Sequence, residues 1–285
     1  SSGAHYPEIG GEITAALYFT TNDLEVALVD DDFVDQAAVD AYNAANGTNY
    51  TWGYDAFATV QGGVDAVTGS TVYVNPGVYE EQVVITGDVQ VIGSGRGVTT
   101  IQSPADLVVS FGASTQNYPV VLIQNAAIAS ISDLTVDGLG RGNLNYRFVG
   151  IGFSDAGGGV YNCDVLNIMD TPFSGAQHGV GIYAWNDDGT ARTITVEGCL
   201  VEGFQKTGMA LNANDASPLT VAVSGNTVNG AGATTVTAQN GIQVWCNTAT
   251  GTVEDNTVTG IAYDNTSATT KWVATSILNY YADLD

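Results

Sequence analysis

The sequence is poor in basic residues. It contains six Lys plus Arg against 30 Asp plus Glu, which gives a formal net charge of −24. Because neutralising phosphates requires clustered Lys and Arg side chains, this balance excludes nucleic acid and anionic membrane surfaces as partners. Charged residues make up only 13% of the chain, against about 25% in an average globular domain, so the acidity comes from missing cations more than from added carboxylates.

Cysteines and long apolar runs are also scarce. The three cysteines, Cys163, Cys199 and Cys246, leave at least one thiol unpaired and cannot form a disulfide framework. No apolar run approaches the roughly 18 residues of a membrane span, so no membrane insertion is expected. No basic segment followed by an apolar one stands at the start, so a secretion signal is expected to have been removed or to lie outside this sequence. The acidic composition and the three N-glycosylation sequons favour a secreted or cell-surface protein.

Residues 1–54 differ in pattern from the rest of the chain. Two apolar segments, residues 13–19 and 24–29, are typical of strands, and an acidic turn follows them. Residues 33–42 then carry apolar side chains at helical spacing. We interpret residues 1–54 as a small α/β extension and residues 55–285 as the main domain.

Helix boundaries can be predicted from capping residues. Asp31 or Asp32 is expected to cap the first helix, and Gly47 is placed to end it. A second helix is predicted over residues 55–68, with Asp55 as its N-cap.

From Ser70 onward, short β-type runs are separated by Gly, Asn and Asp, and they repeat. Five segments superimpose without gaps: residues 131–136, 160–165, 196–201, 223–228 and 253–258. A second set lies between them: residues 150–153, 181–185, 208–212 and 241–245. Two interleaved repeats of roughly 30 residues are typical of a solenoid in which each strand stacks in parallel on its counterparts.

The fourth position of the first repeat forms one column. Its residues are Leu134, Cys163, Cys199, Asn226 and Asn256. Asn side chains stacked about 4.8 Å apart can hydrogen-bond as a ladder, and Cys is a small apolar substitute in such a column. We therefore predict a buried, stacked column with inert thiols; a disulfide between Cys163 and Cys199 is the alternative.

A longer segment connects these repeats to a known fold. The predicted second helix leads into Thr71-Val-Tyr-Val-Asn-Pro-Gly-Val-Tyr-Glu80, then into apolar runs at residues 83–85, 89–93 and 99–101. This segment resembles the opening rungs of the right-handed parallel β-helix, or pectin-lyase-like, superfamily, and the repeats extend the likeness to about Gly260. The resemblance implies an all-β solenoid with an N-terminal capping helix. It is specific for fold and does not identify an activity.

No complete catalytic motif accompanies this resemblance. The stretch Gly77-Val-Tyr79-Glu-Glu81 is similar to the first motif of pectin methylesterases. The family's Gln-Asp-Thr-Leu, Asp-Phe-Ile-Phe-Gly and Leu-Gly-Arg-Pro-Trp segments have no counterpart, and the carboxylate and histidine motifs of polygalacturonases do not fit either. No catalytic residue is therefore assigned.

The rare cations nevertheless fall together. On the repeat alignment, Arg147, His178 and Lys206 stand three or four residues before the strand anchors Ile151, Ile182 and Met209. If the protein is an enzyme, these three would serve a lyase or epimerase for acidic glycans, which needs a base and cations that stabilise a carboxylate. The alternative is that they balance nearby carboxylates.

Aromatic and amide side chains form a second predicted cluster. Strand alternation directs Tyr183, Trp185, Asn212, Gln243 and Trp245 outward on one face. Flat rings beside amides suit a sugar and equally suit a protein interface. The alternative is that a loop or the C-terminal tail covers them.

The two ends of the chain carry candidates for self-assembly. They are Ile13, Leu17 and Phe19 near the start and Trp272 and Tyr281 near the end. Unpaired strand edges recruit other chains, and a contact between unlike surfaces propagates as a filament. No cofactor or metal site is predicted, although Ca²⁺ or salt is expected to reduce the repulsion between such acidic subunits.

These patterns favour a non-catalytic extracytoplasmic β-helix protein. Such a protein would be a structural component of a cell-surface layer, sheath or filament, or a surface adhesin. Its expected partners are like subunits or a polysaccharide. The alternative is a polysaccharide-active enzyme, a lyase or epimerase for acidic glycans.

Overall fold

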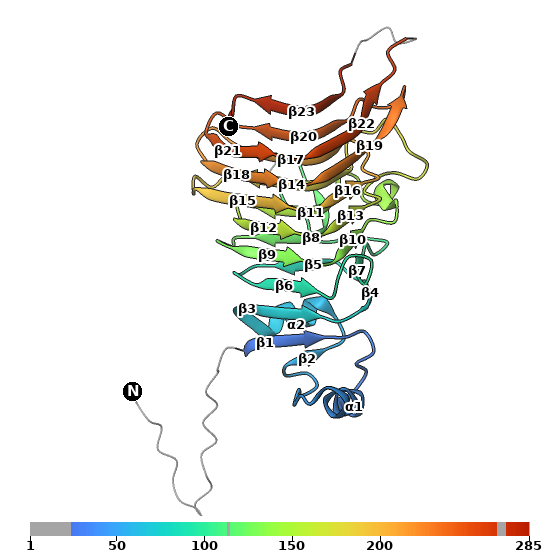
Figure 1. Cartoon of the computed structure of the whole chain (residues 1–285), viewed down its shortest axis with the longest axis vertical. Helices are drawn as coiled ribbons and strands as arrows, with labels where there is room; N and C mark the ends of the chain where they lie inside the picture. The colour runs from blue at the N-terminus through green and yellow to red at the C-terminus, as the bar shows by residue number, and fades with distance from the viewer. Residues whose placement is uncertain (1–23, 113–114, 267–271, 285) are drawn as a thin grey trace, which may run out of the picture.

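The computed structural model describes residues 24–112, 115–266 and 272–284. The predicted assembly residues Ile13, Leu17 and Phe19 lie outside this part of the chain. In the described part, the chain coils through three parallel sheets that run the length of the molecule (Figure 1).

Each sheet collects one strand from successive rungs. Sheet A contains β2 (Ala56–Phe57), β1 (Leu24–Val29), β3 (Val67–Val74), β6 (Gln90–Gly93), β9 (Ala129–Ser132), β12 (Gly158–Tyr161), β15 (Arg192–Glu197), β18 (Leu219–Ser224), β21 (Ala249–Glu254) and β24 (Asp283–Leu284). Sheet B contains β4 (Gly77–Glu80), β7 (Thr99–Gln102), β10 (Thr135–Asp137), β13 (Asp164–Leu166), β16 (Leu200–Glu202), β19 (Thr227–Thr234) and β22 (Thr257–Tyr263). Sheet C contains β5 (Val83–Ile85), β8 (Tyr118–Gln124), β11 (Phe148–Ser154), β14 (Val180–Asn186), β17 (Thr207–Ala213), β20 (Asn240–Trp245) and β23 (Thr275–Tyr280). The helices are α1 (Gln36–Asn46), α2 (Val60–Ala66) and the short 3-10 turn η1 (Arg141–Asn143).

This arrangement confirms the predicted fold class. The chain is a right-handed parallel β-helix. Strand β1, from the predicted α/β extension, pairs in parallel with β3 and thereby joins sheet A. The extension and the solenoid therefore share a sheet.

The first helix begins later than predicted. Asp35 caps α1, because its carboxylate accepts a hydrogen bond from the backbone three residues on, whereas Asp31 or Asp32 was expected. The Asp31 carboxylate instead accepts a hydrogen bond from the Val78 N–H, which lies in the solenoid. Gly47 ends the helix in a left-handed conformation with φ of 69°, as predicted.

The capping helix is shorter than the predicted range 55–68. Asp55 caps no helix, because the residues after it form β2 and pair with β1. The N-cap of α2 is Thr59, and the Glu81 carboxylate accepts hydrogen bonds from the Val60 and Gln61 N–H groups at 2.7 and 2.9 Å. The motif that is similar to pectin methylesterases thus contributes a helix cap, which is a structural role.

The predicted ladder is present in the core. Cys163, Cys199 and Asn226 are at most 1% exposed, and the amide of Asn226 donates to the Asn256 side chain at 2.8 Å. The Cys199 N–H donates to the Asn226 Oδ1 at 2.9 Å. All three cysteines are free thiols, so the alternative of a disulfide between Cys163 and Cys199 is wrong.

The strand register of sheet C also agrees with the repeat alignment. Ile151, Ile182, Met209 and Ile242 pair in register across β11, β14, β17 and β20, and all four are buried. Because successive side chains alternate between the two faces of a sheet, the residues next to these four project outward from the same strands. This outer face of sheet C carries the candidate site.

Candidate ligand-binding site on sheet C

A pocket of about 240 Å³ lies on the outer face of sheet C, and the three predicted cationic residues line it together. Arg147, His178 and Lys206 precede the aligned strands β11, β14 and β17, which brings them to one end of the pocket. Its other predicted residues are Tyr183, Asn212 and Gln243. Two groups that the sequence places separately thus meet in one site, which we call the anion pocket.

Arg147 stands in an uncommon backbone conformation. Its φ is 62°, a left-handed value that costs a non-glycine residue about 1–2 kcal/mol. The Arg147 carbonyl accepts a hydrogen bond from the Tyr118 N–H at 3.0 Å, which ties the turn to the neighbouring rung. The side chain is half-buried at the pocket wall.

His178 is part of the wall and is not available for proton transfer. Its side chain is 3% exposed, with Nδ1 accepting from the Phe148 N–H at 3.3 Å and Nε2 lying 3.2 Å from the Asp170 carboxylate. Burial lowers the pKa of His178, although the Asp170 carboxylate acts in the opposite direction. The imidazole is therefore neutral near pH 7 with both nitrogens engaged.

The loop between β13 and β14 depends on a residue that the sequence patterns do not single out. The buried Gln205 accepts a hydrogen bond from the Asp170 N–H at 3.0 Å and donates one to the Ala176 carbonyl at 3.0 Å. The Ser174 hydroxyl also donates to the Asp170 carboxylate. The repeats could not predict these hydrogen bonds of Gln205, because the loop lies outside them. The one available indication is the general rule that buried polar groups are hydrogen-bonded.

The cations of this protein divide into two groups. Of the six Lys and Arg residues, Lys271 lies outside the described residues. Three of the other five form ion pairs, which are Arg96 with Asp164 at 3.3 Å, Arg141 with Glu80 at 3.0 Å and Arg192 with Asp188 at 2.8 Å. Arg147 and Lys206 have no carboxylate partner among the described residues, and both line the anion pocket.

Lys206 is held by the backbone. Its ammonium donates to the Ala238 carbonyl at 2.6 Å, and burial lowers its pKa. In the described part of the chain, no Asp or Glu lines the pocket, although the protein has 30 of them. The described pocket lining thus carries Arg147 and Lys206 and no carboxylate within a strongly acidic molecule, which suits an anionic group.

Amide side chains form the floor of the pocket. Asn240 donates to Gln243 at 3.2 Å, Gln243 donates to Asn212 at 3.1 Å, and the Asn212 amide contacts the Tyr183 hydroxyl. Burial raises the pKa of Tyr183, so its hydroxyl stays protonated. The network spans three rungs and fixes groups that can donate and accept hydrogen bonds.

The predicted aromatic face is covered only in part. The Phe111 ring lies 5.6 Å from the Tyr183 ring, so a loop does shield Tyr183. Trp185 is half-buried, whereas Trp245 is 46% exposed. Both tryptophans lie outside the anion pocket, in a neighbouring hollow. Trp272 and Tyr281, predicted for assembly, are 60% and 68% exposed.

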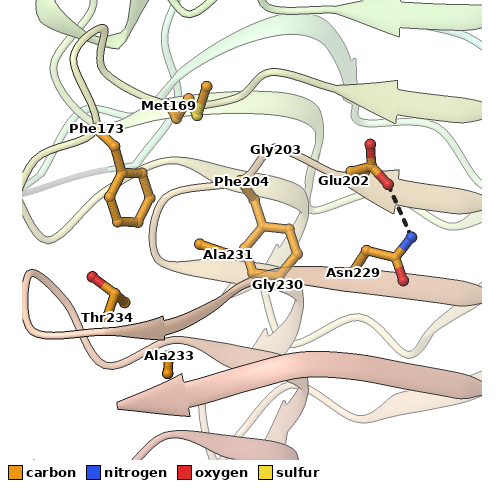
Figure 2. Close-up of a pocket in the computed structure, with 10 residues that line it drawn as sticks. All are labelled: Met169, Phe173, Glu202, Gly203, Phe204, Asn229, Gly230, Ala231, Ala233 and Thr234. Carbon is orange, nitrogen blue, oxygen red and sulfur yellow. Dashed lines mark hydrogen bonds between the residues drawn. The ribbon is translucent and has the colours of Figure 1, made fainter. Parts of the chain in front are cut away.

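A larger pocket of about 600 Å³ lies on the side of sheet B, and Figure 2 shows it. Met169 and Phe173 form one side, and Phe204 lies across from them. Its one carboxylate, Glu202, accepts a hydrogen bond from Asn229 at 2.9 Å. No Lys, Arg or His of the described residues lines it, so it offers less chemistry than the anion pocket.

Two further features bear on cofactors and membranes. Asp30, Asp31 and Asp32 bring their carboxylates close together, but Asp30 and Asp31 already accept hydrogen bonds from Asn75 and Val78. Within the described ranges, the helices are too short and too polar to cross a bilayer.

Comparison with known proteins finds similar solved structures and no match by sequence. No protein family model matches the sequence, and no curated protein matches it. Solved structures that are similar include a pectin methylesterase from carrot, with 13% identity and a TM-score of 0.36 over 91% of this chain and 89% of that one. The pectin methylesterase PemA from Erwinia chrysanthemi has 11% identity and a TM-score of 0.34 over 80% of this chain and 70% of that one. A pectin methylesterase in complex with a hexasaccharide has 10% identity and a TM-score of 0.34 over 79% and 70%. With TM-scores below 0.5, these similarities carry no argument about this chain.

Proposed function

We propose that this protein binds an acidic polysaccharide and holds the carboxylate of one uronate residue between the Arg147 guanidinium and the Lys206 ammonium. The observation that carries the proposal is that the two described cations without an ion-pair partner line the same pocket. A guanidinium binds a carboxylate through two parallel hydrogen bonds, and an ammonium adds a compact charge.

The remaining lining favours a sugar as the carrier of the carboxylate. Asn240 and Gln243 present amides, Tyr183 presents a hydroxyl, and the buried Asn212 hydrogen-bonds to Gln243. These groups both donate and accept hydrogen bonds, as sugar hydroxyls do. The volume of about 240 Å³ lies below the roughly 300–1,000 Å³ of a typical small-molecule pocket, which suits a single sugar residue.

Binding without catalysis fits the pocket best. Glycoside hydrolysis commonly uses two carboxyl groups, and among the described residues none lines the pocket. His178, an expected proton-transfer group, has both ring nitrogens engaged. The protein would then act as an extracytoplasmic adhesin or surface component that recognises glycans. Lys206 remains the candidate base for a lyase or epimerase, because burial lowers its pKa.

Calorimetric titration with oligouronates tests this proposal. Charge-assisted hydrogen bonds contribute about 1.5–3 kcal/mol, so Arg147→Met and Lys206→Met should each weaken binding roughly 10- to 150-fold. Arg192→Met, which removes a cation already paired with Asp188, is the matched control and should leave affinity unchanged. Binding that survives both pocket variants would refute the proposal, and unsaturated sugar products would favour the lyase instead.

Self-assembly is a second candidate, favoured by the last rung. Ile277 continues the inward column of sheet C and is 48% exposed, whereas Ile242 beneath it is buried. Strand β23 has a neighbour on one edge only, within the described residues. An apolar segment of another copy, such as residues 13–19, whose structure lies outside the described residues, would cover this edge.

A further inference from the structure

A second hollow of about 400 Å³ lies beside the anion pocket. Four aromatic side chains line it: Trp185, Trp245, Tyr280 and Tyr281. Its remaining lining is small or polar: Ala213, Asn214, Asp215 and Asn247. We call it the aromatic hollow.

The two sites are neighbours along the strands of sheet C. On β14, Tyr183 lines the anion pocket and Trp185 the aromatic hollow, and on β20 the same holds for Gln243 and Trp245. The members of each pair are two residues apart, which along a strand is about 6.4–6.8 Å. A ligand that fills both sites therefore carries two linked groups at about that separation.

The rings of the hollow are arranged as walls. The Trp245 and Tyr280 rings lie 6.1 Å apart at 75°, and those of Tyr280 and Tyr281 lie 4.3 Å apart at 66°. Trp245 and Tyr280 remain 46% and 47% exposed, so a ligand can reach both side chains. Tyr281 has φ of 68°, a strained value for a bulky residue, and it is 68% exposed.

The charge of the two sites differs. Asp215 lines the aromatic hollow, and no Lys or Arg of the described residues does. A second carboxylate would be repelled there, whereas the apolar face of an uncharged sugar ring can pack on Trp245 and Tyr280. The polar rim, with Asn214 and Asn247, can bind the hydroxyls of such a ring.

We propose that the aromatic hollow is a subsite for a neutral sugar linked to the uronate. The ligand is then a heteropolysaccharide of acidic and neutral sugar residues, and it crosses sheet C along the strand direction. This inference rests on the proposed function, because the anion pocket must hold the uronate. It assigns Tyr281 to the ligand site in addition to the role in assembly that the sequence favours.

Calorimetric titration of the full chain with three probes tests the inference. The probes are glucuronate, a hyaluronan tetrasaccharide, in which glucuronate alternates with N-acetylglucosamine, and a galacturonan tetrasaccharide. We expect the hyaluronan fragment to bind at least tenfold more tightly than either of the others. Trp245→Ala and Tyr280→Ala should each weaken binding of that fragment about three- to tenfold and leave glucuronate binding unchanged.

Two further variants separate binding from folding. Tyr73→Ala removes a ring that is 45% exposed on sheet A, and it should leave all affinities unchanged. Tyr281→Gly places glycine at a left-handed position, so it should weaken binding of the hyaluronan fragment without lowering the unfolding midpoint.

The failures can be told apart. Suppose that glucuronate binds through Arg147 but the hyaluronan tetrasaccharide binds no more tightly, or binds more tightly in a way that Trp245→Ala does not reduce. The neutral-sugar subsite would then be wrong, and the assignment of the anion pocket would be unaffected. Tighter binding of the galacturonan than of the mixed fragment would also overturn the neutral-sugar assignment. If no uronate binds, the proposed function fails and takes this inference with it.

Discussion

Replacing Asn226 by Leu tests the ladder that holds the rungs together. Asn226 is 1% exposed, and its Oδ1 accepts a hydrogen bond from the Cys199 N–H at 2.9 Å. Its amide donates to the Val196 carbonyl at 2.9 Å and to the Asn256 side chain at 2.8 Å. Leucine has a similar size but satisfies none of these groups. An unsatisfied buried group costs about 1–3 kcal/mol, and losses within one network do not add fully, so we expect a loss of about 2–4 kcal/mol.

The measurement is the thermal unfolding midpoint. For a chain of this size, about 1 kcal/mol shifts the midpoint by roughly 2–4 °C, so Asn226→Leu should lower it by about 4–16 °C. Asn229→Leu is the matched control, because that amide bonds to Glu202 on the exposed side of sheet B. Its effect should stay within about 0.5 kcal/mol. Equal midpoints for the two variants would refute the ladder as a source of stability.

Three further predictions concern titration, thiols and association. Burial lowers the pKa of His178, so below the ordinary value of about 6.5 the unfolded chain binds a proton that the folded chain does not. The free energy of unfolding should therefore fall as the pH drops from 7 toward the lowered pKa. His178→Gln should remove that part of the pH dependence in thermal melts. Burial raises the pKa of Cys163 and raises that of Cys199 to about 11, so a thiol reagent should modify them only as fast as the protein unfolds, and rapid labelling of the native protein would contradict this. Replacing Trp272 and Tyr281 by Ser should weaken association in sedimentation experiments, and a wild-type protein that stays monomeric at high concentration with salt and Ca²⁺ would argue against self-assembly.

The sequence repeats predicted the strands and their register, because stacking of successive rungs requires equivalent residues at equivalent positions. Ile151, Ile182 and Met209 align in the sequence because each sits on the previous one in the core, so any slip would expose the whole strand face. The same periodicity predicted that Asn226 is buried. Helix ends were less predictable, because Asp55 is as good a cap in composition as Thr59, and pairing of the next residues with β1 decides between them.

The sequence predicted which residues lie together in the anion pocket, but not what each of them does there. The alignment brings Arg147, His178 and Lys206 to one end of sheet C. The loop that supplies Asp170 does not follow the repeat, so the pairing that makes His178 structural could not be foreseen. Likewise, that Arg147 and Lys206 lack carboxylate partners depends on where distant acidic residues lie in space.

A crystal structure with a bound uronate oligosaccharide would locate the carboxylate that the anion pocket holds. We expect one carboxylate within about 2.7–3.2 Å of both the Arg147 guanidinium and the Lys206 ammonium, with sugar hydroxyls on Asn240 and Gln243. A ligand seated in the pocket beside Phe173 and Phe204 (Figure 2), or a carboxylate that contacts neither cation, would contradict this expectation.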